Sequence, residues 1–115
     1  MAIVLYGIKN CDTMKKARAW LDARNVAYTF HDYKVSGIER AKLAAWCKSA
    51  GWERVLNKSG TTFRKLGDAE RANLNEAKAI ELMLAQPSMI KRPVLELGGT
   101  LLVGFSPESY AKAVL

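Results

Sequence analysis

The order of apolar and polar positions in the first third of the chain predicts a strand, a helix and a second strand. Residues 2–6 form a short continuous apolar run, which is typical of a buried strand. Residues 12–24 are predicted to be a helix, and residues 27–33 alternate as in a strand. The apolar positions of the predicted helix recur three and four residues apart, at Met14, Ala17, Trp20 and Leu21. A strand–helix–strand segment of this length predicts parallel strands joined by a right-handed crossover.

The middle of the chain, about residues 37–90, is predicted to be helical. Helices are expected over residues 39–50 and 75–85, where apolar side chains gather on one face. Residues 52–56 and 62–66 are expected to form single helical turns. No strand pattern interrupts this segment, so we expect a helical insertion between two halves that contain strands.

The end of the chain predicts a hairpin followed by a helix. Residues 94–97 and 100–103 are apolar strands separated by Gly98-Gly99, a sequence that favours a two-residue turn. Ser106 is a suitable N-cap for a final helix, with Pro107 at its first position.

This order of elements predicts an α/β, thioredoxin-like fold in a single domain over residues 1–115. The sheet is expected to be mixed and four-stranded, flanked by helices, with the helical insertion in the middle of the chain. In such a fold the end of the first strand lies beside the start of the hairpin. We therefore expect Cys11 and the Arg92-Pro93 dipeptide to meet at one edge of the sheet.

Cys11 is the leading candidate for chemistry, because it lies where the first strand gives way to a helix. Unpaired backbone N–H groups and the helix dipole at such a junction favour a thiolate, which is the nucleophilic form of cysteine. Lys9 adds positive charge, and Asn10 and Thr13 are either plain loop and cap residues or donors to a bound sulfur or oxygen. Met14 stands where the second cysteine of a Cys-x-x-Cys motif would be, so a one-thiol mechanism needs an outside thiol or a distant partner.

Each remaining candidate residue also fits an ordinary structural role. Arg92 is either a surface residue or a fixed guanidinium that stabilises the thiolate and binds an anionic substrate group. Arg64 is either surface charge or part of the site. Cys47 fits core packing on the apolar face of its helix, and His31 fits a structural role in its strand. We expect no metal site, because two cysteines and one histidine in different elements make no ligand set.

Composition narrows the possible partners. The net charge is +7, but no run of five like charges occurs, so we expect no specific nucleic-acid binding. A positive surface would attract small anions such as a glutathione carboxylate. No apolar stretch approaches the ~20 residues that a bilayer requires, so no membrane is expected. Two cysteines and no secretory signal predict a reducing, cytoplasmic location.

Four segments together resemble the arsenate-reductase-related (ArsC/Spx-like) family of thioredoxin-fold proteins, in particular its YffB-type branch. They are residues 5–13 (LYGIKNCDT), 60–66 (GTTFRKL), 90–94 (IKRPV) and 102–108 (LVGFSPE). The resemblance implies that Cys11 is the nucleophile, Arg92 its electrostatic partner and Pro93 the cis proline of the fold. It implies a glutathione-dependent thiol reductase that binds no cofactor and uses glutathione as co-substrate. Lys9, Asn10, Thr13, Arg64 and Pro93 are then expected to contact glutathione or the oxidised thiol substrate.

The sequence also departs from the arsenate-reducing members of that family. Gly7 stands where those members carry a histidine, and Asn57 and Gly104-Phe105 stand where they carry arginines. Because arsenate is a multiply charged oxyanion, we expect it to bind poorly here. A weak arsenate reductase is one alternative. An Spx-like regulator that binds RNA polymerase is the other.

Overall fold

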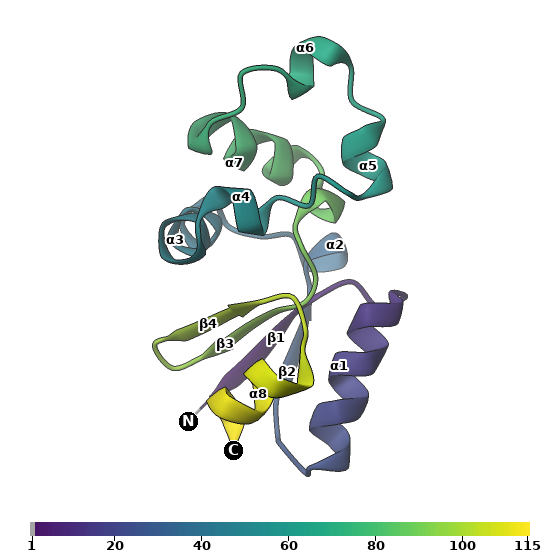
Figure 1. Cartoon of the computed structure of the whole chain (residues 1–115), viewed down its shortest axis with the longest axis vertical. Helices are drawn as coiled ribbons and strands as arrows, with labels where there is room; N and C mark the ends of the chain where they lie inside the picture. The colour runs from purple at the N-terminus through teal and green to yellow at the C-terminus, as the bar shows by residue number, and fades with distance from the viewer. Residues whose placement is uncertain (1) are drawn as a thin grey trace. The chain divides into compact units, whose positions relative to one another are not determined.

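The computed structural model describes residues 2–115 and divides into two compact units (Figure 1). Unit 1 combines both ends of the chain, up to Ser36 and from Arg92 onward. Unit 2 is the continuous segment from Gly37 to Lys91. The single domain over residues 1–115 stays a prediction, and Met1 lies outside the described residues.

Unit 1 contains one mixed sheet of four strands in the order β2-β1-β3-β4. Its strands are β1 (Ile3–Gly7), β2 (Thr29–Asp32), β3 (Val94–Leu97) and β4 (Thr100–Val103). β1 runs parallel to β2 and antiparallel to β3, which forms a hairpin with β4. The predicted α/β fold, with its mixed four-stranded sheet flanked by helices, is confirmed.

One face of this sheet packs against two helices, α1 (Asp12–Ala23) and α8 (Pro107–Val114) (Figure 1). Leu5 and Leu95 point into this core from the two central strands, while Leu21 and Tyr110 enter it from the helices. The inward positions alternate along each strand and recur at helical spacing along α1, as the apolar pattern predicts. Burial of these side chains fixes α1, and with it the residue at its N-terminus.

The pairing register places three chain segments at the same edge of the sheet. Gly7, the last residue of β1, pairs with Asp32, the last residue of β2. Tyr6 pairs with Val94, the first residue of β3. The loop after β1, the segment after β2 and the segment before β3 therefore leave the sheet together.

The predicted strand over residues 27–33 is too long, because β2 ends at Asp32 and Tyr33 begins the short helix α2 (Tyr33–Ser36). The Asp32 carboxylate explains this end. Its Oδ1 accepts hydrogen bonds from the backbone N–H groups of Lys34, at 3.0 Å, and Val35, at 3.3 Å. An acidic side chain that binds these free N–H groups favours a helical turn over a further strand residue.

Unit 2 is helical. Its elements are α3 (Arg40–Ala50), α4 (Trp52–Val55), α5 (Thr61–Arg64), α6 (Asp68–Arg71), α7 (Glu76–Ala85) and the 3-10 turn η1 (Pro87–Met89). The core of this unit includes Leu43, Trp46 and Met83, all almost fully buried. The backbone closes on itself through two hydrogen bonds, from Asn57 N–H to the Met89 carbonyl and from Lys91 N–H to the Val55 carbonyl. The sequence did not predict α6, which buries no side chain and so has no apolar pattern.

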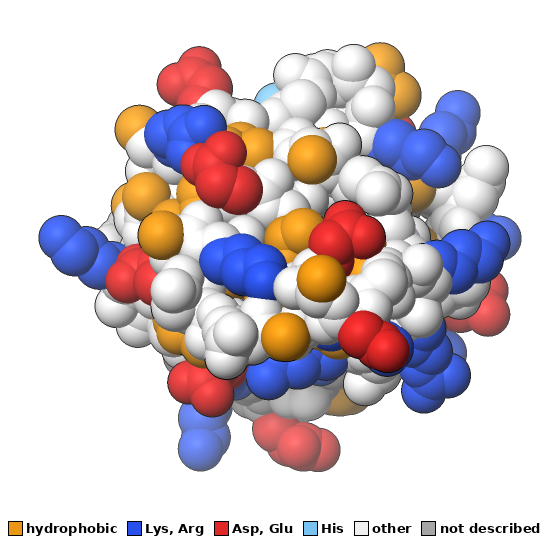
Figure 2. Space-filling view, turned by 90° about the horizontal axis from the view of Figure 1, so that it is seen from above, with side chains coloured by type: hydrophobic (Ala, Val, Ile, Leu, Met, Phe, Trp, Pro, Cys, Tyr) orange, Lys and Arg blue, Asp and Glu red, His pale blue; other side chains and the backbone are white. Residues whose placement is uncertain are grey.

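Charged side chains of both signs cover unit 2. Ion pairs join Arg40 to Glu81 and Arg71 to Asp68. On the face of the molecule drawn in Figure 2, basic and acidic side chains are intermingled rather than gathered by sign. Within residues 2–115, no helix combines the length and the apolar character needed to cross a bilayer.

Candidate functional site

Cys11 is the N-cap residue of α1. The chain leaves β1 after Gly7, and Cys11 has the extended conformation (φ −139°, ψ 131°) that precedes a helix. Its carbonyl accepts the first backbone hydrogen bond of α1, from Lys15 N–H at 2.9 Å. The side chain is partly exposed and rests against the core of unit 1. A sulfur in this position faces the free N–H groups of the first helical turn and also remains accessible to a reactant.

Arg92 reaches the same sulfur from the segment that precedes β3. It lies two residues before Val94, whose partner in β1 is Tyr6. Its guanidinium hydrogen bonds to the Cys11 sulfur. The bond between Arg92 and Pro93 is cis, as the family resemblance implied. The Pro93 carbonyl accepts a hydrogen bond from Gly104 N–H at 2.8 Å, so this segment is also tied to the end of β4.

These neighbours favour the ionised form of Cys11. Burial alone would raise the pKa of the thiol. The backbone N–H of Met14, the Arg92 guanidinium and the backbone N–H of Thr13 outweigh burial, so the pKa lies below its usual value. Burial would likewise lower the pKa of Arg92, but hydrogen bonding to Cys11 and the nearby Tyr33 and Cys11 raise it. The contacts of Cys11 and Arg92 therefore favour a thiolate beside a charged guanidinium.

Tyr33 is a third member of this group, and the sequence did not single it out. It is fully buried at the start of α2, and its hydroxyl hydrogen bonds to the Arg92 guanidinium. Burial raises the pKa of Tyr33 well above its usual range. In the sequence Tyr33 is the last residue of the strand predicted over residues 27–33, so nothing distinguished it from an ordinary strand residue.

The side chains of the other predicted site residues have no described contact with the Cys11 sulfur. Lys9 and Asn10 are exposed in the loop between β1 and α1, and the Thr13 side chain is exposed on the first turn of α1. Thr13 reaches Cys11 through its backbone N–H, as described above. Arg64 is exposed at the last position of α5 in unit 2. The roles of all four in binding a substrate stay predictions.

Gly7 and Met14 pack so closely that no side chain fits at position 7 while Met14 keeps its position. A Cβ atom on Gly7 would lie 2.2 Å from the Met14 sulfur, 2.6 Å from its Cε and 3.2 Å from its Cγ. Met14 has no exposed surface. A glycine at position 7 therefore leaves room for Met14, which stands where a Cys-x-x-Cys motif would have its second cysteine.

The second cysteine has the opposite character to Cys11. Cys47 is buried in unit 2 beside Trp46 on α3, as its pattern predicted. Burial, with a smaller contribution from Glu76, raises its pKa to about 11. Both cysteines are free thiols. Within residues 2–115, no group of three or more His, Cys, Asp or Glu side chains is placed to hold a metal ion.

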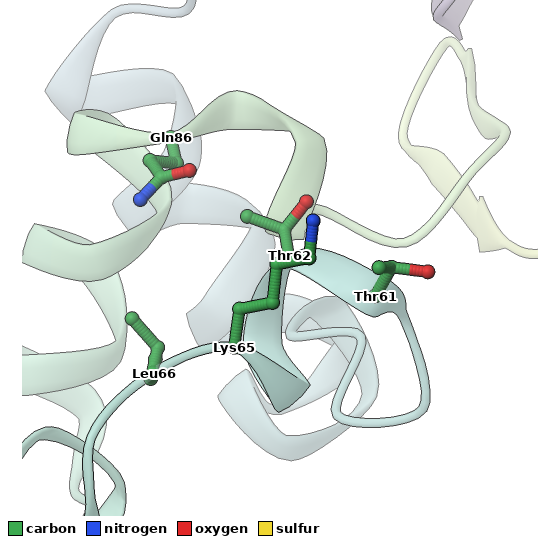
Figure 3. Close-up of a pocket in the computed structure, with 5 residues that line it drawn as sticks. All are labelled: Thr61, Thr62, Lys65, Leu66 and Gln86. Atoms are coloured by element: carbon green, nitrogen blue, oxygen red, sulfur yellow. The ribbon is translucent and has the colours of Figure 1, made fainter.

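Unit 2 also has a small hollow of about 290 Å³. Figure 3 shows the side chains that surround it, which are Thr61, Thr62, Lys65, Leu66 and Gln86. The Thr62 hydroxyl is 3.0 Å from that of Ser88, so the two share a hydrogen bond. None of the predicted site residues lines the hollow.

Comparison with known proteins places this arrangement in a family. The sequence model of the ArsC family matches residues 6–113. A solved structure of a YFFB protein is 68% identical, with a TM-score of 0.97 over 99% of this chain and 100% of its own. An arsenate reductase (ArsC) related protein from Brucella melitensis is 56% identical, with a TM-score of 0.79 over 97% of this chain and 93% of its own. The global transcriptional regulator Spx of Streptococcus mutans is 26% identical over 92% of this chain and 78% of its own length.

Proposed function

Since the chain belongs to the ArsC family, we propose that it is a glutathione-dependent thiol reductase with a single nucleophilic cysteine, Cys11. The observation that carries the proposal is the contact of the Cys11 sulfur with the Arg92 guanidinium and the first turn of α1. A thiolate held in this way and partly open to solvent is suited to attack an oxidised sulfur.

The proposed reaction has two exchange steps. The Cys11 thiolate attacks the glutathione sulfur of a mixed disulfide, a Cys11–glutathione disulfide forms, and the substrate leaves as a thiolate that takes up a proton. A second glutathione thiolate then attacks the glutathione sulfur of this adduct. Glutathione disulfide is released, and the electrons of the broken bond return to Cys11 as thiolate. Glutathione is therefore the co-substrate, and we place the reaction in the reducing cytoplasm.

The one-thiol scheme is supported by the residues around Cys11. Met14 occupies the position of a second cysteine in the first turn of α1, so no disulfide can form within that turn. The raised pKa and burial of Cys47 make it a poor nucleophile. An external thiol is then needed to release the adduct. Arg92, and the exposed Lys9 beside the site, would attract the carboxylates of glutathione.

The test is mass spectrometry after incubation with oxidised glutathione. We expect one added glutathione on Cys11, removed by excess reduced glutathione. The Cys11→Ser variant should take up none and show no turnover of a glutathione mixed disulfide. Cys47→Ser, the matched control, should behave as the wild type. Absence of the adduct from the wild-type protein, or turnover retained by Cys11→Ser, would contradict the proposal.

A second candidate function is favoured by the identity with Spx. Under this alternative the chain is a regulator that docks on RNA polymerase, and Cys11 is incidental or sensory. Affinity capture from a cell extract separates the two functions. Polymerase recovered equally with the wild type and with Cys11→Ser would favour the regulator. Turnover with glutathione mixed disulfides and no polymerase would favour the reductase.

A further inference from the structure

We propose that Tyr33 is a positioning residue that holds the Arg92 guanidinium against the Cys11 sulfur. The inference rests on the proposed function, because it assigns a residue to the activation of the same thiolate. Tyr33 does not itself react: it acts on Cys11 through Arg92.

The backbone fixes Tyr33 at the site. The preceding residue, Asp32, is the last residue of β2 and pairs with Gly7 at the end of β1. The Asp32 carboxylate then turns the chain into α2 by accepting the N–H groups of Lys34 and Val35. Tyr33 lies at this turn with no exposed surface, so its ring has a single environment. The hydroxyl is therefore presented at the edge where β1, β2 and β3 end.

Arg92, by contrast, needs an external constraint. It is partly exposed and lies in the segment that enters β3, and an arginine side chain loses considerable rotamer freedom when it is held in one position. A guanidinium has five N–H donors in a planar fork. The Tyr33 hydroxyl accepts from one part of the fork, and other N–H groups remain for the sulfur. A buried tyrosine is already rigid, so this contact orients the arginine without a further loss of freedom in the tyrosine.

The charges around Tyr33 show that it acts by orientation rather than by its own charge. The groups that face it are Arg92, Cys11 and the Asp32 carboxylate. Burial and the two anions both disfavour a tyrosinate here, so the hydroxyl stays neutral at working pH. A neutral hydroxyl beside a guanidinium leaves the positive charge intact for the sulfur. The Arg92 guanidinium thus keeps its full charge and is held in a fixed orientation.

The test compares two tyrosine-to-phenylalanine variants. Tyr33→Phe removes the hydroxyl and keeps the ring. Tyr110→Phe is the matched control, because Tyr110 is also fully buried in unit 1 and, within residues 2–115, its hydroxyl has no hydrogen-bond partner. The rate of iodoacetamide alkylation of Cys11 is measured across pH by peptide mass spectrometry. We expect Tyr33→Phe to lower the rate at pH 7 about two- to tenfold, the effect of one lost hydrogen bond, and to move the profile to higher pH. Tyr110→Phe should leave it unchanged.

A second pair of variants shows whether the effect passes through Arg92. In an Arg92→Ala background, Tyr33→Phe should no longer change the alkylation profile. An equal change in both backgrounds would overturn the positioning role, and so would an unchanged profile for Tyr33→Phe alone. A wild-type profile centred at the ~8.5 of a free thiol would instead contradict the proposed function. Only the wild-type protein is needed for that distinction.

The inference stays testable if Tyr33→Phe does not fold. Rotation of the Arg92 guanidinium can be followed by NMR in the wild type. We expect separate resonances for its terminal N–H groups, because two fixed partners hold the group. One averaged resonance from a freely rotating guanidinium would overturn the proposal.

Discussion

Replacing Gly7 with alanine tests whether the first turn of α1 is built around the contact with Met14. The new Cβ would overlap the Met14 sulfur at 2.2 Å and approach its Cγ to 3.2 Å. The Cγ contact lies near the root of the side chain, so rotation of the terminal methyl cannot remove the overlap. Met14 has no exposed surface and so has no open side into which it could move. Alanine at position 7 therefore overpacks the core.

The magnitude follows from two opposing effects. Overpacking a well-filled core costs about 1–3 kcal/mol. Replacing glycine by alanine restricts the unfolded chain and returns about 0.4–1 kcal/mol where the backbone allows alanine. The backbone of Gly7 is not in the left-handed region, so that gain applies. We expect a net loss of stability of about 1–2 kcal/mol for Gly7→Ala.

A double-mutant cycle isolates the contact. Met14→Ala alone should cost about 2–5 kcal/mol, because it leaves a cavity. In the Gly7→Ala/Met14→Ala variant the overlap is gone, and the alanine methyl fills part of that cavity. The double variant should therefore lose less stability than the sum of the single variants, by about 1–3 kcal/mol.

The assay is urea unfolding followed by tryptophan fluorescence, to which Trp20 in the same core contributes. Gly99→Ala is the matched control, because a Cβ there meets nothing within 4 Å. It should be neutral or slightly stabilising. If Gly7→Ala unfolds at the wild-type urea concentration, or if the two single losses simply add, the steric argument is wrong. The same cycle with histidine at position 7 asks whether the residue that the family resemblance implies for arsenate-reducing members fits only without Met14.

Four further predictions follow from the site and the core. Arg92→Ala should slow alkylation of Cys11 at pH 7 roughly tenfold, because a charged partner is lost, and a profile like that of the wild type would contradict the contact. Tyr110→Phe should leave the melting temperature unchanged or raise it, because the lost hydroxyl has no partner within residues 2–115; a clear drop would reveal one. Ser106→Ala should cost about 0.5–2 kcal/mol in urea unfolding, since the Ser106 hydroxyl accepts from Ser109 N–H at 3.1 Å. Finally, the lowered pKa of Cys11 stabilises the fold at pH above the unfolded value of about 8.5, and this contribution is lost as pH falls through the folded pKa. The stability of the wild type relative to Cys11→Ser should therefore rise with pH up to about 8.5 and then level off, and a difference that does not depend on pH would contradict the shift.

Local signals explain which parts of the fold the sequence could predict. Gly98-Gly99 between two apolar runs and Ser106-Pro107 before a helix are short-range patterns with direct conformational causes, and both elements are found where they were expected. α6 was missed because it is four residues long, buries no side chain, and is held by polar contacts. Two of these contacts come from Lys78, whose Nζ donates to the Ala69 and Ala72 carbonyls. Such contacts leave no periodic trace in a sequence.

Only the part of the site that follows from the topology of the sheet could be predicted from the sequence. The order of elements brings the Cys11 and Arg92 segments to one edge of a sheet, so their meeting could be expected without coordinates. Tyr33 could not be found in this way. Its role depends on where β2 ends, and that end is decided by one carboxylate that binds two backbone N–H groups. If β2 ended one residue later, Tyr33 would be a strand residue; because β2 ends at Asp32, Tyr33 begins α2 and its side chain lies at the site.

The discontinuity of unit 1 has a consequence for biosynthesis. β1 is a central strand, but its antiparallel partner β3 begins at Val94 and leaves the ribosome only after the whole of unit 2 has been made. Unit 2 is continuous from Gly37 to Lys91, so its helices can condense while one side of β1 still lacks a neighbour. The nascent chain therefore exposes the apolar edge of β1 while unit 2 is translated. A chaperone that protects this edge would act during that interval.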